Sequence, residues 1–161
     1  MWLSRRTLLL GLGLSALAGC GFEPVYGTNG SASALRGAVL VDDPKDRQQF
    51  QLTEQLEARL GRATAARYGL KVDLSVQEEG LAISGSNDIT RYNVLGVADF
   101  VLRDLATGQP VMSDKVNTFT SYSASAQPVA TLAAERDATQ RLMTALADKI
   151  VTQLLLNAGN L

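Results

Sequence analysis

An unbroken alternation of apolar and polar residues is the strongest structural constraint in this sequence. From Leu70 to Gln77 every even-numbered residue is apolar and every odd-numbered residue is polar or charged. Successive side chains of a β-strand point to opposite faces of a sheet, so this period of two predicts a half-buried strand. We therefore expect a sheet with one face covered and one face toward solvent.

Three other segments are predicted to be strands. Residues 35–41 are short, apolar and β-branched toward their end, and residues 111–122 are rich in Thr, Val and aromatics. Residues 90–103 place one set of apolar side chains at even positions, whereas the odd positions mix charged ends with an apolar middle. A kink or turn is expected at residues 78–80, after which Leu81 and Ile83 resume the alternation, and turns are expected at residues 85–88 and 104–110.

Two helices complete the predicted domain. The first runs from Pro44 to Ala63, since Asp43 can cap a helix that has proline at its first position and leucines follow at four-residue spacing. The second opens after Pro128 with a broad apolar stripe and should be the longer helix. The order β-α-β-β-β-α predicts an α+β fold over residues 35–161, with a mainly antiparallel sheet of about four strands and two helices on one face.

The N-terminal segment has the layout of a secretory signal. Arg5 and Arg6 precede an apolar run over residues 8–17, and small residues lead to Cys20. The nucleus Leu-Ala-Gly-Cys resembles a bacterial lipobox, which implies cleavage before Cys20 and diacylation of its thiol. We expect residues 1–19 to be a signal peptide and residues 20–34 a lipidated N-terminus with a flexible tether, rich in Gly and Pro. Sec and twin-arginine export both remain open.

Composition argues against several kinds of protein. The chain has no histidine, one cysteine and a formal net charge of -1. It therefore lacks the usual general base and the ligands of a zinc site, and its charge does not suit nucleic-acid binding. The carboxylate pairs Asp42/Asp43 and Glu78/Glu79 fall in expected turns, where capping and solvation explain them. We expect no enzyme activity, no metal and no cofactor.

Three basic residues are the candidate ligand-binding residues. Arg91, Arg103 and Lys115 fall on the two long predicted strands and could gather on the sheet face away from the helices. There they would attract an anionic group. The alternative is cross-strand pairing with Asp99 or Asp114, which is a common role for charged residues in strands.

The start of the expected mature chain carries a family resemblance. The segment Cys20-Gly21-Phe22-Glu23-Pro24-Val25-Tyr26-Gly27 resembles the mature N-terminus of the LPS-assembly lipoprotein family LptE, in its alphaproteobacterial form. The resemblance implies an outer-membrane lipoprotein, anchored on the periplasmic side, that plugs the β-barrel translocon LptD and assists lipopolysaccharide assembly without catalysis. The alternative is a periplasm-facing lipoprotein that carries a hydrophobic ligand or acts as an envelope scaffold.

Overall fold

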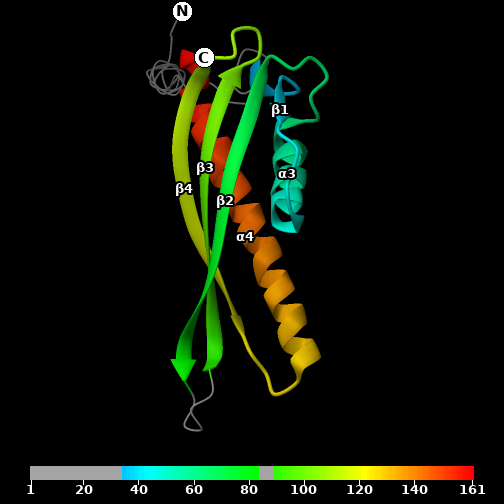
Figure 1. Ribbon diagram of the computed structural model, residues 1–161, viewed down its shortest axis with the longest axis vertical. Helices are drawn as coiled ribbons and strands as arrows, with labels where there is room; N and C mark the ends of the chain where they lie inside the picture. The colour runs from blue at the N-terminus through cyan, green and yellow to red at the C-terminus, as the bar shows by residue number, and fades with distance from the viewer. Residues whose placement is uncertain (1–33, 84–88) are drawn as a thin grey trace, which may run out of the picture.

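The computed structural model describes residues 34–83 and 89–161 (Figure 1). Along the chain its elements are β1 (Val39–Val41), α3 (Arg47–Leu60), β2 (Tyr68–Ile83), β3 (Ile89–Asp104), β4 (Pro110–Ser123), α4 (Pro128–Asn157) and the 3-10 turn η1 (Ala158–Asn160). The predicted signal peptide, and the predicted tether as far as residue 33, lie outside the described residues. So does the predicted turn at residues 85–88.

The described strands form one sheet in the order β1-β2-β3-β4. β1 pairs with β2 in parallel, whereas β2 with β3 and β3 with β4 are antiparallel. Figure 1 shows α4 running diagonally along one face of the three long strands, with α3 beside it on the side of β1. The expected α+β fold and its β-α-β-β-β-α order are confirmed.

The first strand is shorter than predicted. β1 begins at Val39, and Leu35 lies instead in a helical turn with only 1% of its surface exposed. Gly37 adopts a φ of 71° in the reversal that separates Leu35 from β1, and its N–H donates to the carbonyl of Leu60 at 2.8 Å. The apolar character of this segment therefore reflects burial of a turn as well as a strand.

β2 is longer than predicted. A turn at residues 78–80 is excluded, because Glu78, Glu79 and Gly80 stay paired with β3 opposite Val94, Asn93 and Tyr92. The register becomes irregular only between Gly80 and Ile83. Two adjacent glutamates are tolerated because both are exposed near the end of the sheet.

α3 starts later than predicted. Its N-cap is Asp46, whose side chain accepts a hydrogen bond from the N–H of Gln49 at 2.8 Å. Asp43 and Pro44 lie in the extended segment that precedes the helix. Asp46 caps the helix because it has the side-chain oxygen that satisfies a free N–H of the first turn. The predicted leucine stripe, Leu52, Leu56 and Leu60, is buried as expected.

α4 begins at Pro128 as predicted and is 30 residues long, against 14 for α3. Proline suits the first helical position because it lacks an N–H that would need a partner. The buried side of the helix consists of Ala138, Leu142, Met143, Leu146, Ala147, Ile150, Val151 and Leu154. Arg59 of α3 forms an ion pair with Asp148 of α4 and joins the two helices at the surface.

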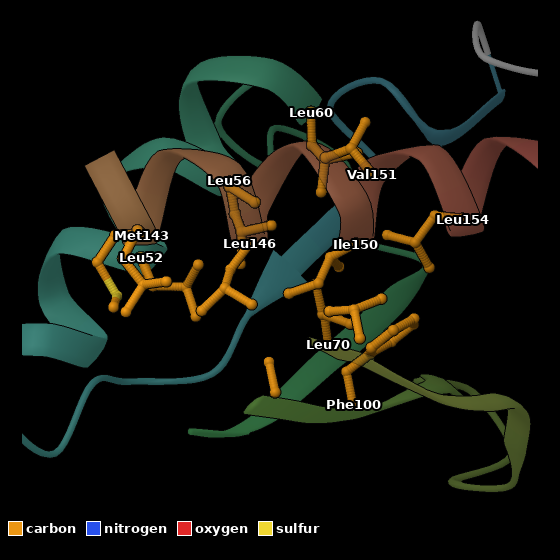
Figure 2. Packing of buried hydrophobic residues seen from close by; sticks show 14 of the residues in the cluster. Leu52, Leu56, Leu60, Leu70, Phe100, Met143, Leu146, Ile150, Val151 and Leu154 are labelled. Carbon is orange, nitrogen blue, oxygen red and sulfur yellow. The ribbon is translucent and has the colours of Figure 1, made fainter. Parts of the chain in front are cut away.

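The core lies where α3, α4 and the sheet meet. Figure 2 shows leucines of α3, the buried side of α4, and Leu70 and Phe100 of the sheet pointing toward one another. α4 packs tightly on β3 at Gly96, where a Cβ atom would lie 2.9 Å from Cδ1 of Leu146. Burial of this apolar surface is the main source of folding free energy. It also leaves the other face of the long strands without a covering helix in the described residues.

Candidate binding surface

The face of the sheet away from the helices is formed by odd-numbered residues of β2, β3 and β4, and we call it the outward face. The pairing fixes its rows: Asp73 lies opposite Asp99, which lies opposite Lys115, and Gln77 lies opposite Leu95, which lies opposite Phe119. No helix of residues 34–83 and 89–161 covers it (Figure 1). The candidate residues Arg91, Arg103 and Lys115 all belong to this face, as their odd positions on paired strands require.

The middle of the outward face is apolar. Leu95, Val97 and Val101 of β3 are half-buried, and Phe119 of β4 is 63% exposed beside Leu95. Polar residues border this stripe on both neighbouring strands, including Ser75, Gln77 and Asn117. An exposed aromatic beside partly exposed aliphatic residues is typical of a surface that binds another apolar group.

Ion pairs interrupt the apolar stripe at the row of Asp99, which lies between Val97 and Val101. Lys115 contacts Asp99 at 3.0 Å, and Lys71 contacts Asp73 at 2.8 Å. Lys45, from the segment before α3, lies 3.9 Å from Asp73. The cross-strand pair of Lys115 with Asp99 is one of the two alternatives that the sequence left open. The ammonium group of Lys115 therefore already has a carboxylate partner.

Arg103 is held by a carboxylate at the end of the sheet near β1. Its Nη1 and Nη2 atoms donate to the two oxygens of Asp42 at 3.0 and 2.6 Å. The side chain reaches Asp42 by crossing over Gly69 of β2, where a Cβ atom would lie 3.0 Å from both Cζ and Nε of Arg103. Gly69 thus provides the space for a forked ion pair between β3 and the end of β1.

Arg91 lies at the opposite end of β3. It is exposed, and its backbone neighbours are Ala82 and Ser123. Among the described residues it has no carboxylate within ion-pair distance. Arg91 and Arg103 are roughly 40 Å apart at the usual rise of a strand. The structure therefore places the three predicted residues on one face without bringing them together.

Sequence reasoning missed Phe119 and Asp42. The two faces of the strand at residues 111–122 could not be told apart from its pattern, because Thr and Ser occupy both. Asp42 was interpreted as part of a helix start, whereas its carboxylate serves Arg103. The one sequence signal for this contact was Gly69, because a glycine in an otherwise regular strand can mark a site where another group approaches the backbone closely.

A groove of 410 Å³ lies between β1, the segment before α3, α3 and β2. Its base is apolar, with Leu52, Leu56 and Val72, and its rim is charged, with Lys45 and Lys71 beside Asp42 and Asp43. Its size falls within the range of small-molecule sites. The lining suits a ligand that has both an apolar and a polar part.

The structure adds little to the remaining sequence predictions, which concern Cys20, the second carboxylate pair, metal binding and membrane spans. Cys20 lies outside the described residues. The second carboxylate pair, Glu78 and Glu79, is exposed on β2. Within residues 34–83 and 89–161, no group of three potential ligands could hold a metal ion, and no helix is long and apolar enough to span a bilayer.

The sequence matches one protein-family model. The model is LptE, described as lipopolysaccharide-assembly, and it matches residues 37–154. That range runs from the turn before β1 almost to the end of α4, and thus includes most of the core and the whole described part of the outward face. No curated protein matches the sequence significantly.

Several solved structures share the fold. A candidate lipoprotein from Caulobacter crescentus CB15 is 26% identical, with a TM-score of 0.67 over 80% of this chain and 96% of that one. Rare lipoprotein B from Shewanella oneidensis is 13% identical, with a TM-score of 0.59 over 76% of this chain and 96% of that one. A minor lipoprotein from Acinetobacter baumannii is 18% identical, with a TM-score of 0.55 over 74% and 89% of the two chains.

Proposed function

Because this chain belongs to the LptE family of lipopolysaccharide-assembly proteins, we propose that it is the lipoprotein partner of an LptD-type β-barrel in the outer membrane. In this role the domain would sit as a plug in the barrel lumen and assist delivery of lipopolysaccharide to the outer leaflet. The family match supports the general role in lipopolysaccharide assembly. The proposal adds three statements to this general role: a barrel partner, an outer-membrane location and the absence of catalysis.

The observation that carries the proposal is the uncovered outward face. A plug must present a wide polar surface to a water-filled lumen while its core stays apolar elsewhere. Here the described helices lie on the opposite face, so three long strands can meet a barrel wall directly. The stripe around Leu95 and Phe119 would form the dry centre of that contact, and Ser75, Gln77 and Asn117 its polar border.

Co-purification with the barrel is the direct test. The full-length protein, extracted from the envelope in a mild detergent and captured by an affinity tag, should bring an outer-membrane barrel in an approximately one-to-one ratio. A protein captured without any barrel protein, although folded and located in the envelope, would contradict the proposal.

Contact with lipopolysaccharide is assigned to Arg91, Arg103 and Lys115. Arginine can donate a forked pair of hydrogen bonds to a phosphate. Arg91 is the leading candidate because the other two already pair with Asp42 and Asp99. Arg91→Gln should weaken lipopolysaccharide binding and reduce its dependence on salt more than Lys115→Gln does. Unchanged binding in both variants would remove the basic residues from the proposal.

The lipid anchor is assigned to Cys20. Each buried methylene contributes about 0.8 kcal/mol of membrane affinity, and two or more acyl chains give stable attachment. Cys20→Ser should abolish incorporation of a labelled fatty acid, because a thiol accepts the diacylglyceryl group. Labelling that persists in this variant would contradict the anchor.

The groove beside β1 supports a second candidate function, that of a carrier for a hydrophobic ligand. Its 410 Å³ and apolar base could hold part of an acyl chain, with Lys45 and Lys71 near an anionic group. Val72→Trp would fill the groove from the sheet side. A carrier would then lose bound lipid in native mass spectra, whereas a barrel partner would retain its barrel.

A further inference from the structure

The groove beside β1 presents apolar surface that no described element covers. Leu40 of β1 is 47% exposed, and Val41 and Val72 are half-buried along the same groove. Beneath them lie the buried Leu52 and Leu56 of α3. Apolar surface of this kind gains free energy when an apolar group displaces water from it. The groove therefore suits an apolar side chain.

The charges of the rim favour an acidic group on the side of β2. Lys71 and Lys45 lie 2.8 and 3.9 Å from the same carboxylate, that of Asp73, so two ammonium groups share one negative charge. Asp42 already pairs with an arginine. Asp43 is exposed and belongs to no ion pair of the described residues. An acidic group in the groove would therefore be attracted to the two lysines and repelled by Asp43.

The N-terminal segment of this same chain has both kinds of group. Glu23 is the only charged residue among residues 20–33, and the larger apolar side chains around it are Phe22, Val25 and Tyr26. A tyrosine combines an apolar ring with a polar hydroxyl group. The groove offers the matching combination, because polar side chains of α3 line it beside its apolar base.

The segment is long enough to reach the groove. The described chain begins at Ala34, and Leu40 in the groove follows six residues later, so the two lie at most about 22 Å apart. Tyr26 precedes Ala34 by eight residues and can lie up to about 29 Å from it. A short connection within one chain also gives an effective concentration on the order of mM, so a weak contact suffices.

We propose that residues 22–26 bind in the groove beside β1. The ring of Tyr26 packs on the apolar base, and the carboxylate of Glu23 lies beside Lys45 and Lys71. The contact uses the side of the domain formed by β1 and α3. It therefore leaves the outward face free for the proposed barrel, and it does not depend on that proposal.

This contact determines where the proposed lipid anchor lies. Only Gly21 separates Cys20 from the bound segment, so the acylated residue is held beside the groove rather than at the end of a long tether. The bound segment also occupies the space that a carried acyl chain would need. The carrier function and this contact are thus alternatives for one groove.

Site-specific photocrosslinking in the full-length protein tests the contact. The photoreactive analogue p-benzoylphenylalanine replaces Tyr26 and keeps an aromatic ring at that position. After irradiation in mild detergent and proteolysis, mass spectrometry should identify internal crosslinks from residue 26 to peptides that contain residues 40–56 or 71–72. Crosslinks to peptides outside the groove, or adducts with lipid in place of the groove peptides, would overturn the proposal.

Filling the groove should prevent the crosslink. Val72→Trp fills it from the sheet and Thr53→Trp from α3, and each should lower the crosslink yield several-fold. Two variants are used because a change that disturbs the fold at one position leaves the other as the test. Asn117→Trp, exposed on β4, is the matched control and should leave the yield unchanged. A yield that neither filling variant lowers would contradict the contact.

Charge exchange tests the position of Glu23. Lys45→Glu combined with Lys71→Glu should lower the crosslink yield several-fold, because the carboxylate of Glu23 then meets two negative groups. Adding Glu23→Lys should restore it. Lys149→Glu changes an exposed cation of α4 outside the groove and should have no effect. A yield that the paired lysine exchange leaves unchanged, or that Lys149→Glu lowers equally, would overturn the assignment of Glu23.

Discussion

The two faces of β3 differ in how strictly the fold determines their residues. Under α4, Val94, Gly96, Ala98, Phe100 and Leu102 are buried, and at Gly96 the leucines of α4 leave no room for a Cβ atom. On the outward face Leu95, Val97 and Val101 are only half-buried. Val97 and Val101 have polar neighbours on both adjacent strands, whereas Leu95 lies between Gln77 and Phe119. β3 thus has apolar residues on both faces, and packing against α4 explains only those of the inner face.

The two sets of apolar residues on β3 therefore have different roles, one in the stability of the domain and the other in the proposed binding. Apolar side chains under α4 gain free energy by leaving water, so the fold requires them. The outward stripe gains little in the isolated domain, because no described element covers it. The proposed barrel interaction would account for its apolar residues, because it would bury them against a partner. The following predictions test this separation.

The largest difference should come from the same substitution on the two faces. Leu102→Ala removes a fully buried side chain and should cost about 2–5 kcal/mol of unfolding free energy. Leu95→Ala, on the same strand but half-buried, should cost about 1 kcal/mol or less. Urea unfolding monitored by circular dichroism measures both. Equal losses would mean that something covers the outward face of the isolated protein.

The next effect should come from adding volume. Gly96→Val places atoms where a Cβ would already lie 2.9 Å from Leu146 and 3.1 Å from Leu142, and overpacking of this kind costs about 1–3 kcal/mol. Ser75→Val adds volume on the solvent side of β2 and should leave the unfolding midpoint nearly unchanged. A neutral Gly96→Val would show that α4 can move away from the sheet.

The forked ion pair at the end of the outward face should have a smaller effect. A double-mutant cycle with Arg103→Gln and Asp42→Asn should give a coupling free energy of about 1 kcal/mol, because both side chains are about one-third exposed, at 34% and 35%. The coupling should fall at high salt. A coupling near zero at low salt would assign Arg103 to ligand binding alone.

The smallest effect should come from Asp73, an exposed carboxylate of the outward face. A hydrogen bond from Lys71 lowers the pKa of Asp73; partial loss of solvent opposes this, and the charges of Lys71 and Lys45 lower the pKa further. A lowered pKa stabilises the folded protein above the unfolded value of about 4 and loses that contribution as pH falls through the folded value. Asp73→Asn should therefore flatten the unfolding free energy between about pH 5 and pH 3. An unchanged slope would contradict the Lys71 contact.

Much of the fold could be predicted because its signals are local. The alternation from Leu70 to Gln77 and the stripe of α4 each follow from one period in the sequence. The start of α3 could not be predicted, since Asp43 before Pro44 and Asp46 before Arg47 are both acceptable caps. The strand through Glu78 and Glu79 was also missed, because pairing with β3 overrides the weak strand propensity of two glutamates.

The candidate site was predictable only in part. Strand parity placed Arg91, Arg103 and Lys115 on one face, but their partners depend on the sheet register. Lys115 meets Asp99 because β4 turns back on β3, and Arg103 meets Asp42 only because parallel pairing of β1 brings that carboxylate next to Gly69. Pairing with Asp99 could be named as an alternative from the sequence, whereas the contact of Arg103 with Asp42 depends on the parallel pairing of β1 and has no signal in a single sequence.

The most direct test of the central claim compares two exposed phenylalanines in the full-length protein. Phe119 lies on the outward face and is 63% exposed, and Phe50 lies on α3 and is 60% exposed. The measurement is the amount of outer-membrane barrel that co-purifies with each variant in mild detergent. Phe119→Ser should lose most of the barrel while keeping the wild-type unfolding midpoint, and Phe50→Ser should retain it. Full barrel recovery with Phe119→Ser, or equal loss with both variants, would contradict the account.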